Sequence, residues 1–355
     1  MIKYLGSKRR LVPVLGAMAE AVEARTATDL FTGTTRVAQE FKRRGLDVTA
    51  VDVATYSQVL GRCYLEADAR TVDIAAVAEE LARLAALPGR RGYVTETFCE
   101  RAHYFQPHNG RRIDAIREAI EHHHAGTALY PILLTSLLEA ADRVDSTTGL
   151  QMAYLKDWAP RSYRDLDLRV PELIDGTGRS VLGDAVEAVD RLDPVDLAYL
   201  DPPYNQHRYF TNYHVWETLV RWDAPEHYGV ACKRMDARDP ATKSVFNSKP
   251  RMPDVFADLL TRVRADVVVV SYNDEAWIGP GRMVEALRDA GHEEVQMIGF
   301  DSRRYVGAQI GVHSPTGERV GQVSHLHNTE LVFVAGARER VEAAVAATGR
   351  PALAS

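Results

Sequence analysis

A glycine-containing turn between two apolar strands constrains the fold of this chain more than any other sequence feature. We expect a strand at residues 27–31, a turn at residues 32–35, and then a helix that ends at Gly45. The next strand, residues 47–52, has a β-branched interior and ends on Asp52, about 20 residues past the turn. Because a strand–helix–strand crossover joins parallel strands, this unit predicts a parallel sheet of the nucleotide-binding kind.

Later apolar runs are expected to extend the sheet. Near-continuous runs of this kind are typical of strands in a sheet that is covered on both faces. Residues 305–323 centre on a proline and glycine turn and predict a β-hairpin. The apolar runs lie at residues 196–200, 266–271 and 330–334.

The middle of the chain is helical in pattern. Long helical stretches, for example residues 74–87 and 130–144, replace the strand signals there. We therefore expect a discontinuous α/β domain interrupted by a helical insertion, with a tail that frays from Thr348 onward. The predicted boundaries are residues 1–59 and 179–345 for the α/β domain, 60–178 for the insertion and 346–355 for the tail.

The composition limits the class of protein. A hydrophobic fraction of 46% with 26% charged residues is that of a folded chain, and no apolar run approaches the roughly 18 residues that cross a bilayer. The N-terminus lacks a signal-peptide apolar region, so we expect a cytoplasmic protein. Cys63, Cys99 and Cys232 are distant from one another and predict reduced thiols. The net charge of −6 argues against a protein that coats nucleic acid non-specifically, although a local basic groove stays open.

The most specific motif is Asp201-Pro202-Pro203-Tyr204, directly after the apolar strand that ends at Leu200. Ligand chemistry gathers at the carboxyl ends of strands in an open parallel sheet, so this tetrapeptide stands where a site is expected. The prolines stiffen the turn and would hold a carboxylate, the Pro202 carbonyl and an aromatic ring together. That set suits a planar base with an amino group, because the two oxygens accept its N–H bonds while Tyr204 stacks on the ring. Taken alone, the motif also fits an ordinary Pro-Pro loop beside a core aromatic.

Seven segments follow one another along the chain in an order that carries more information than any of them alone. They are Lys3 to Lys8, Asp29 to Thr35, Asp52, Gly183-Asp184, Asp201 to Tyr204, Tyr209 to His214 and Ser271 to Glu275. In this order they resemble the motifs of the alpha-class DNA adenine methyltransferases of the Dam and FokI-methylase type. The resemblance covers most of the chain. It implies an α/β fold with a Rossmann-like methyltransferase sheet and a mainly helical inserted target-recognition domain.

The resemblance also implies chemistry. S-adenosylmethionine would be the cofactor, and the substrate would be the 6-amino group of an adenine flipped out of double-stranded DNA at a specific site. Transfer would be direct and in line, with no covalent enzyme intermediate and with S-adenosylhomocysteine as by-product. The catalytic residues implied are Asp201, Pro202 and Tyr204. The cofactor residues implied are Tyr4, Lys8, Phe31, Gly33, Thr34, Thr35, Asp52, Asp184 and Asp201.

Individual roles follow from this resemblance. Asp52 would accept the ribose hydroxyls, and Asp184 the amino group of the cofactor adenine. Amides of the glycine turn and of the following helix would face the methionine carboxylate. Lys8 would pair with that carboxylate or with a DNA phosphate, and it equally fits a solvated N-terminal lysine. Two positions depart from the family pattern: Thr35 replaces a second glycine, and Ala185 stands where relatives often have an aromatic.

DNA contact is expected on two surfaces. Between Pro203 and Met252, eight basic residues outnumber five acidic ones, an excess of three, which suits a wall that contacts phosphates. Target recognition is assigned to the helical insertion by resemblance, through arginines that could reach guanine edges. Taken singly, these arginines also fit solvated helix ends. The implied DNA residues are Pro203, Asn205, Tyr209, Tyr213, Arg90, Arg111, Arg112, Lys243 and Lys249.

Other functions stay open at this point. A nicotinamide-dependent dehydrogenase would share the crossover, but a full Gly-x-Gly-x-x-Gly is absent. A methyltransferase acting on protein, on RNA adenine or on the cytosine 4-amino group would share the pocket, and a non-catalytic DNA-binding relative would share the fold. A cognate restriction endonuclease encoded elsewhere is a further candidate partner. We predict no metal, because three consecutive histidines, residues 122–124, point in different directions on a helix.

Overall fold

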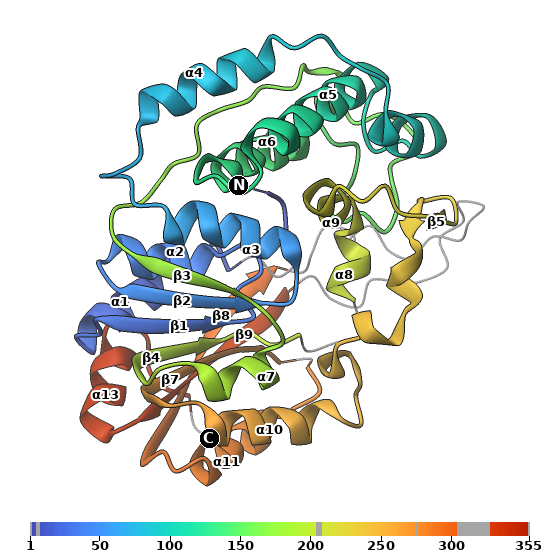
Figure 1. Cartoon of the computed structure of the whole chain (residues 1–355). Coiled ribbons are helices and arrows are strands. Elements are labelled where there is room, and N and C mark those ends of the chain that lie inside the picture. Colours follow the sequence, from blue (N-terminus) through green and yellow to red (C-terminus); the bar gives the residue numbers. More distant parts are fainter. Residues whose placement is uncertain (1, 5–7, 204–207, 275, 304–326, 354–355) are drawn as a thin grey trace.

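The computed structural model describes residues 2–4, 8–203, 208–274, 276–303 and 327–353, and its centre is a seven-stranded sheet (Figure 1). The strand order is β3-β2-β1-β4-β7-β9-β8. The predicted crossover forms β1, α2 and β2, so the mainly parallel α/β fold class is confirmed. The strands are β1 (Thr26–Leu30), β2 (Asp47–Asp52), β3 (Gly178–Leu182), β4 (Val195–Leu200), β7 (Ala265–Asn273), β8 (Glu294–Arg303) and β9 (His327–Gly336).

Strand direction decides which residues meet at the edge of the sheet. The five neighbouring strands β3, β2, β1, β4 and β7 pair in parallel, so their carboxyl ends lie at one edge of the sheet. β9 runs antiparallel to both of its neighbours, and its residue Glu330 lies opposite Asn273, the last residue of β7. The start of β9 therefore reaches the same edge as the ends of the parallel strands.

Helices cover both faces of the sheet, which explains why its central strands are apolar on both sides (Figure 1). One face packs against α1, α2 and α13, and the other against α7, α10 and α11. These helices are α1 (Val12–Ala21), α2 (Arg36–Arg43), α7 (Ala185–Ala188), α10 (Met252–Arg262), α11 (Pro280–Asp289) and α13 (Arg338–Ala346).

A helical layer packs beside the sheet, and its hydrophobic core crosses the predicted insertion boundary. Buried side chains of the insertion contact Ile2, Tyr56 of α3, and Trp216 and Leu219 of α9 in one cluster. The insertion is thus helical as expected, but it shares its core with residues on either side of it. The elements are α3 (Thr55–Gly61), α4 (Ile74–Ala85), α5 (Pro107–His124), α6 (Leu129–Arg143) and two π-helices, Arg62–Glu66 and Thr95–Arg101.

The segment after the predicted catalytic motif adds short elements beside this layer. They are α8 (Tyr209–Asn212), α9 (His214–Arg221), the two-stranded β5 (His227–Tyr228) and β6 (Lys233–Arg234), and 3₁₀ turns at Met235–Arg238, Pro240–Thr242 and Val245–Asn247. Two further 3₁₀ turns lie at Pro160–Tyr163 and Val189–Arg191.

The structure adds to the predicted strands and corrects the predicted tail. β3 and β8 are the two edge strands, where mixed polar and apolar residues give no apolar run. The C-terminus does not fray at Thr348: Leu353 N donates to Met297 O at 2.7 Å, and Arg350 Nη1 donates to Gly299 O at 3.0 Å. Met297 and Gly299 lie on β8, so the last described residues pack along that strand.

Two other expectations concern the chain more widely. The predicted hairpin at residues 305–323 lies outside the described residues. Among the helices that are described, none has the length and apolar character to cross a membrane.

Candidate active site

A cavity of about 240 Å³ opens at the edge where the parallel strands end. Three carboxylates line it: Asp52 at the end of β2, Asp184 just before α7, and Asp201 just after β4. Eight residues singled out from the sequence therefore meet here, as sheet topology predicts. The other five are Tyr4, Phe31, Pro203, Tyr209 and Lys243.

The backbone fixes the Asp52 carboxylate from two sides. Oδ2 accepts a hydrogen bond from Gly33 N at 2.8 Å, and Oδ1 accepts one from Ala54 N at 2.9 Å. Burial raises the pKa of Asp52, and these two N–H groups oppose that rise. Gly33 has φ +55°, and a Cβ atom there would stand 2.9 Å from Tyr4 Cε1. Both the left-handed backbone and the close aromatic ring therefore require glycine.

Thr35 keeps the turn conformation without a second glycine. Its φ of +60° is left-handed, a conformation that β-branched residues rarely adopt. Its hydroxyl accepts from Gln39 Nε2 at 2.8 Å, and its carbonyl accepts from Gln39 N at 2.8 Å. These bonds stabilise the strained residue within the first turn of α2.

The turn differs from the expectation that its amides face an anion. Gly33 N donates to Asp52, and Thr35 N donates to Thr32 O at 2.8 Å, so both amides are already bonded. The side chains of Thr34 and Thr35 are buried and do not line the cavity. Both side chains therefore face the protein interior, and the role of Thr34 and Thr35 in holding the cofactor stays a prediction.

Another part of the cavity lining combines a carboxylate with apolar side chains. Asp184 Oδ1 accepts from Val186 N at 2.8 Å and caps α7, while Ala185 lines the cavity beside it. Phe246 also lines the cavity, and its ring stands 4.8 Å from that of Phe31 in an edge-to-face contact. Phe246 thus brings an aromatic ring to the region where Ala185 lacks one.

Asp201 is held by an ion pair that the sequence did not predict. Lys8 Nζ lies 3.0 Å from Asp201 Oδ1 and also pairs with Glu330 on β9. Burial raises the pKa of Asp201 to about 6, with Lys8 opposing the rise and Glu330 adding to it. Lys8 therefore faces the proposed catalytic carboxylate instead of solvent.

The aromatic residues near the cavity have unequal access to it. The Tyr4 ring stacks on Tyr209 at 5.4 Å and on Tyr213 at 4.6 Å between ring centroids. Tyr209 lines the cavity, but Tyr213 is fully buried and does not. The prediction that Tyr213 contacts DNA is therefore wrong for this structure, since the ring is packed behind Tyr4.

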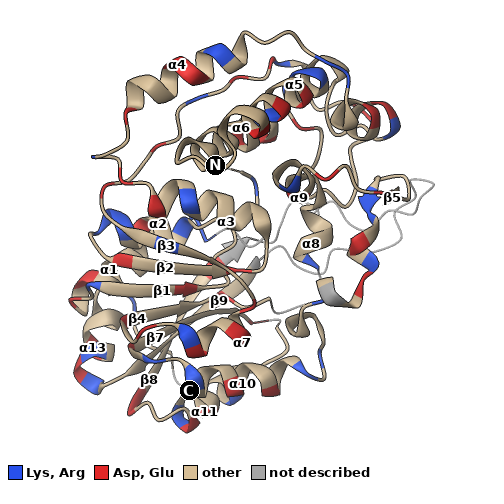
Figure 2. Cartoon of the chain, in the orientation of Figure 1, with Lys and Arg blue, Asp and Glu red and all other residues tan. Residues whose placement is uncertain are grey.

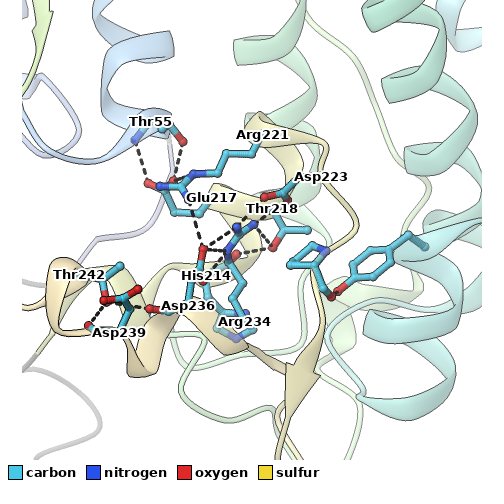
Figure 3. A network of polar contacts seen from close by, with 12 residues as sticks. Thr55, His214, Glu217, Thr218, Arg221, Asp223, Arg234, Asp236, Asp239 and Thr242 are labelled. Atoms are coloured by element: carbon cyan, nitrogen blue, oxygen red, sulfur yellow. Dashed lines mark hydrogen bonds and ion pairs between the residues drawn. The ribbon is translucent and has the colours of Figure 1, made fainter.

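An ionic network fixes the segment of residues 223–249, which we call the wall segment (Figure 3). The Arg234 side chain, only 2% exposed, pairs through both Nη atoms with Asp223 and through Nη2 with Asp236. Its neighbour Arg221 lines the cavity and pairs with Glu217, which accepts from Thr55 N at 2.8 Å. The network joins the wall segment to α9 and to α3.

Buried Arg234 changes the expected phosphate wall. Its guanidinium is enclosed by carboxylates and serves the network, so it is not available to a phosphate. Lys243 and Lys249 are exposed, and Lys243 lines the cavity. The basic charge that faces solvent is thus carried by these lysines and by the exposed Arg208, Arg238 and Arg251, and not by Arg234.

The arginines of the insertion lie away from the cavity. Arg90 and Arg111 are exposed, and Arg90 stands 3.9 Å from Glu118. Arg112 Nη2 donates to Ala85 O at 2.9 Å and so holds the end of α4. Both acidic and basic residues lie on α4 and on α5 (Figure 2), so neither helix is uniformly basic.

Some predicted residues and groups remain to be placed. Tyr204 and Asn205 lie outside the described residues, and Pro202 is buried next to Asp201. The three cysteines are free and buried. Within the described part of the chain, no group of three His, Cys, Asp or Glu side chains could hold a metal ion.

Comparison with known proteins identifies the chain. Residues 4–278 match the model of the D12 class N6 adenine-specific DNA methyltransferases. The chain belongs to this family. It is 30% identical to the type II methyltransferase M.NlaIII of Neisseria lactamica over 86% of this chain and 92% of that protein.

Two further relatives are larger proteins. The modification methylase StsI of Streptococcus sanguinis is 28% identical over 81% of this chain, and M.FokI of Planomicrobium okeanokoites is 26% identical over 84%. The chain spans about half the length of each, 46% and 48%. A solved precorrin methyltransferase of Geobacter metallireducens aligns over 95% of this chain and 93% of its own, with 10% identity and a TM-score of 0.31.

The family fixes the reaction. The chain is a site-specific DNA methyltransferase that acts on the 6-amino group of adenine, with S-adenosylmethionine as cofactor. The cavity fits that cofactor: carboxylates at Asp52 and Asp184 can accept from hydroxyl and amino groups, and the Phe31 and Phe246 rings can pack on a purine. A nicotinamide-dependent dehydrogenase is thereby ruled out.

Sequence reasoning missed two residues of the site, Phe246 and Glu330, and counted a third, Arg221, only among the basic residues of the expected phosphate wall. Phe246 and Arg221 both line the cavity. Glu330 was recognised only as the first residue of an apolar strand. A carboxylate at the start of a strand indicates a site residue only when the direction of that strand in the sheet is known.

Proposed function

We propose that this adenine methyltransferase flips its target base out of double-stranded DNA and grips the 6-amino group with Asp201 and the Pro202 carbonyl. The observation that carries this proposal is the position of Asp201, on the rim of a cavity that Asp52 and Asp184 also line. A base inside a duplex cannot reach such a cavity, and flipping costs a few kcal/mol.

Two acceptors on the amino group would increase its reactivity. The nitrogen lone pair of adenine is delocalised into the ring, and hydrogen bonds from both N–H groups favour a pyramidal nitrogen with a more localised pair. When bound, S-adenosylmethionine would supply a methyl group already activated by a sulfonium, with S-adenosylhomocysteine as the by-product. The chain's own residues then align the nitrogen and hold developing charge with fixed groups. The nitrogen–methyl bond would form as the sulfur–methyl bond breaks, with the sulfur keeping that electron pair and the methylated nitrogen releasing one proton to solvent.

The cofactor would lie along the carboxylates. Asp52 is proposed to accept the ribose hydroxyls and Asp184 the amino group of the cofactor adenine, with Phe31 and Phe246 packing on the ring. Tyr4 supports this arrangement by packing against Gly33, next to the Asp52 carboxylate.

DNA would cover the mouth of the cavity. Lys243 and Lys249 of the wall segment are proposed to contact phosphates, and Tyr209 and Pro203 to contact the flipped nucleotide. Tyr204 and Asn205 are proposed to stack on the base and to contact DNA. We assign target recognition to the insertion, through Arg90, Arg111 and the exposed part of Arg112. Because the relatives are named type II and modification methylases, a cognate endonuclease encoded elsewhere is a proposed partner.

The proposal is tested with labelled S-adenosylmethionine and unmethylated genomic DNA, followed by nucleoside analysis. Wild-type protein should yield N6-methyladenine, and Asp201→Ala should abolish transfer while cofactor affinity stays within a few-fold. Methylated cytosine in the product, or turnover that survives in Asp201→Ala, would contradict the assignment. Sequencing of methylated positions in an expressing host, with Asp201→Ala as control, would then define the target site.

A further inference from the structure

A lysine bridges two carboxylates beside the transfer site. Lys8 Nζ lies 3.0 Å from Asp201 Oδ1 and is in direct contact with Glu330 Oε1. The side chains of Lys8, Glu330 and Asp201 are 7%, 10% and 22% exposed. Three charged groups from the N-terminal segment, the end of β4 and β9 thus converge in a largely buried site, where charges act on one another more strongly than in water.

The antiparallel direction of β9 brings Glu330 next to Lys8. Glu330 pairs with Asn273 at the end of β7 because β9 runs antiparallel. The residue also lies beyond residues 4–278, the part of the chain that the family model matches.

Other titratable groups surround Asp201. Asp29 of β1 is buried, and burial together with the nearby Asp201 raises its pKa to about 7. Tyr199 of β4 shares a hydrogen bond of 2.8 Å with Ser271 of β7 and lies close enough to Asp201 and Lys8 to interact electrostatically. The Lys8 ammonium therefore balances a cluster that is otherwise acidic.

We propose that Glu330 is a positioning residue for methyl transfer, which divides the charge of Lys8 between two carboxylates and so leaves Asp201 a strong acceptor. This inference rests on the proposed role of Asp201. With Lys8 held between both acids, Oδ1 of Asp201 is anchored and Oδ2 is left to the adenine amino group. Without Glu330, the whole ammonium charge would fall on Asp201 and weaken it as an acceptor. Without Lys8, repulsion among the acids would protonate Asp201.

Replacing Glu330 and replacing Lys8 should shift the pH dependence of methyl transfer in opposite directions. In Glu330→Gln, loss of a nearby negative charge lowers the pKa of Asp201. The acid limb, meaning the fall of the single-turnover rate as the pH decreases, should therefore move to lower pH by about one pH unit. The plateau rate should fall several-fold, with cofactor affinity unchanged. In Lys8→Gln, the acid limb should move to higher pH. Glu330→Asp keeps the charge and should keep the limb within a few tenths of a pH unit of wild type.

The measurement is single-turnover transfer from labelled cofactor to unmethylated genomic DNA across pH 5 to 9, with Glu294→Gln as the matched control. Glu294 lies on the neighbouring strand β8, opposite Gly336 at the far end of β9, and pairs with Arg338 at 3.5 Å. Its acid limb should match wild type. An unchanged limb in Glu330→Gln, or equal shifts in Glu330→Gln and Glu294→Gln, would overturn the inference.

Folding and the parent proposal are separated from this test. If circular dichroism shows that Glu330→Gln does not fold, the inference is tested with Lys8→Gln and Glu330→Asp instead. An acid limb that does not move to higher pH in Lys8→Gln would overturn the inference. Wild-type protein that makes no N6-methyladenine would instead reject the proposed function itself.

Discussion

At the scale of single residues, Asp201 links burial to catalysis. In its proposed role its carboxyl must be ionised to accept one N–H of the adenine amino group, yet burial favours its protonated form. Burial and the neighbouring charges together raise its pKa to about 6, so the group is expected to be mostly ionised at neutral pH.

The first prediction concerns pH. Because the pKa of Asp201 is raised to about 6, the single-turnover rate of the wild-type enzyme should fall as the pH decreases through about 6, where the carboxyl gains a proton. Quenched single-turnover reactions at a series of pH values, with saturating DNA and cofactor, measure this fall in rate. A rate that stays flat down to pH 4.5 would contradict the assigned role.

The second prediction concerns Gly33. In Gly33→Ala, the new Cβ meets the Tyr4 ring at 2.9 Å in a left-handed backbone, so the turn that supports Asp52 must shift. Cofactor affinity should fall at least tenfold by calorimetry, equivalent to about 1.4 kcal/mol. Gly45→Ala is the control: φ is +85° there but no atom lies within 4 Å, so it should lose about 1 kcal/mol of stability and keep its affinity. Equal affinity losses in both variants would count against the steric explanation.

At the scale of elements, the wall segment depends on buried charge instead of a hydrophobic core of its own. β5 and β6 have two residues each, too few to be stable alone. Arg234 of β6 pairs with Asp223 and Asp236 inside the wall segment and donates to Thr218 of α9. An arginine fork suits this role because it can bond two carboxylates at once.

The third prediction follows for Arg234→Lys. A lysine cannot reproduce the fork, so the wall segment should loosen, with a loss of ~1 to 3 kcal/mol in stability and a raised KM for DNA. Cofactor affinity should hold. Arg262→Lys is the control, since Arg262 also pairs with two aspartates, Asp190 and Asp258, but outside the cavity lining. A DNA effect of the same size in the control would remove the wall segment from the explanation.

At the scale of the whole molecule, the insertion and the α/β part are not separate bodies in energetic terms. One hydrophobic cluster runs from the insertion helices through α3 to α9, with Trp216 fully enclosed in it. Removing the insertion would expose the apolar faces of α3 and α9, which the sheet does not cover.

The fourth prediction uses this shared core. Trp216→Ala should lower the free energy of unfolding by ~3 to 5 kcal/mol, through lost burial and the cavity left behind. A single coincident transition by far-ultraviolet and near-ultraviolet circular dichroism is expected in both proteins, because the shared core couples the two layers. Two separate transitions in the wild-type protein would show that the insertion folds independently.

The sequence by itself determined the crossover, the parallel sheet and the edge at which the chemistry lies. Local patterns suffice for these, because a β-α-β unit has one favoured topology and its strand ends collect at one edge. The motifs at Asp52, Asp184 and Asp201 therefore met in one cavity as expected. Family membership, and with it the reaction, was also readable from motif order.

Only the tertiary structure decided which polar groups are buried together. The reversed direction of β9 brings Glu330 to Lys8 and Asp201, whereas a parallel strand would place it at the opposite edge. Packing encloses Tyr213, which the resemblance assigned to DNA, and Arg234, one of the eight basic residues counted toward the phosphate wall. These outcomes depend on contacts between residues far apart in the chain, and no local pattern carries that information.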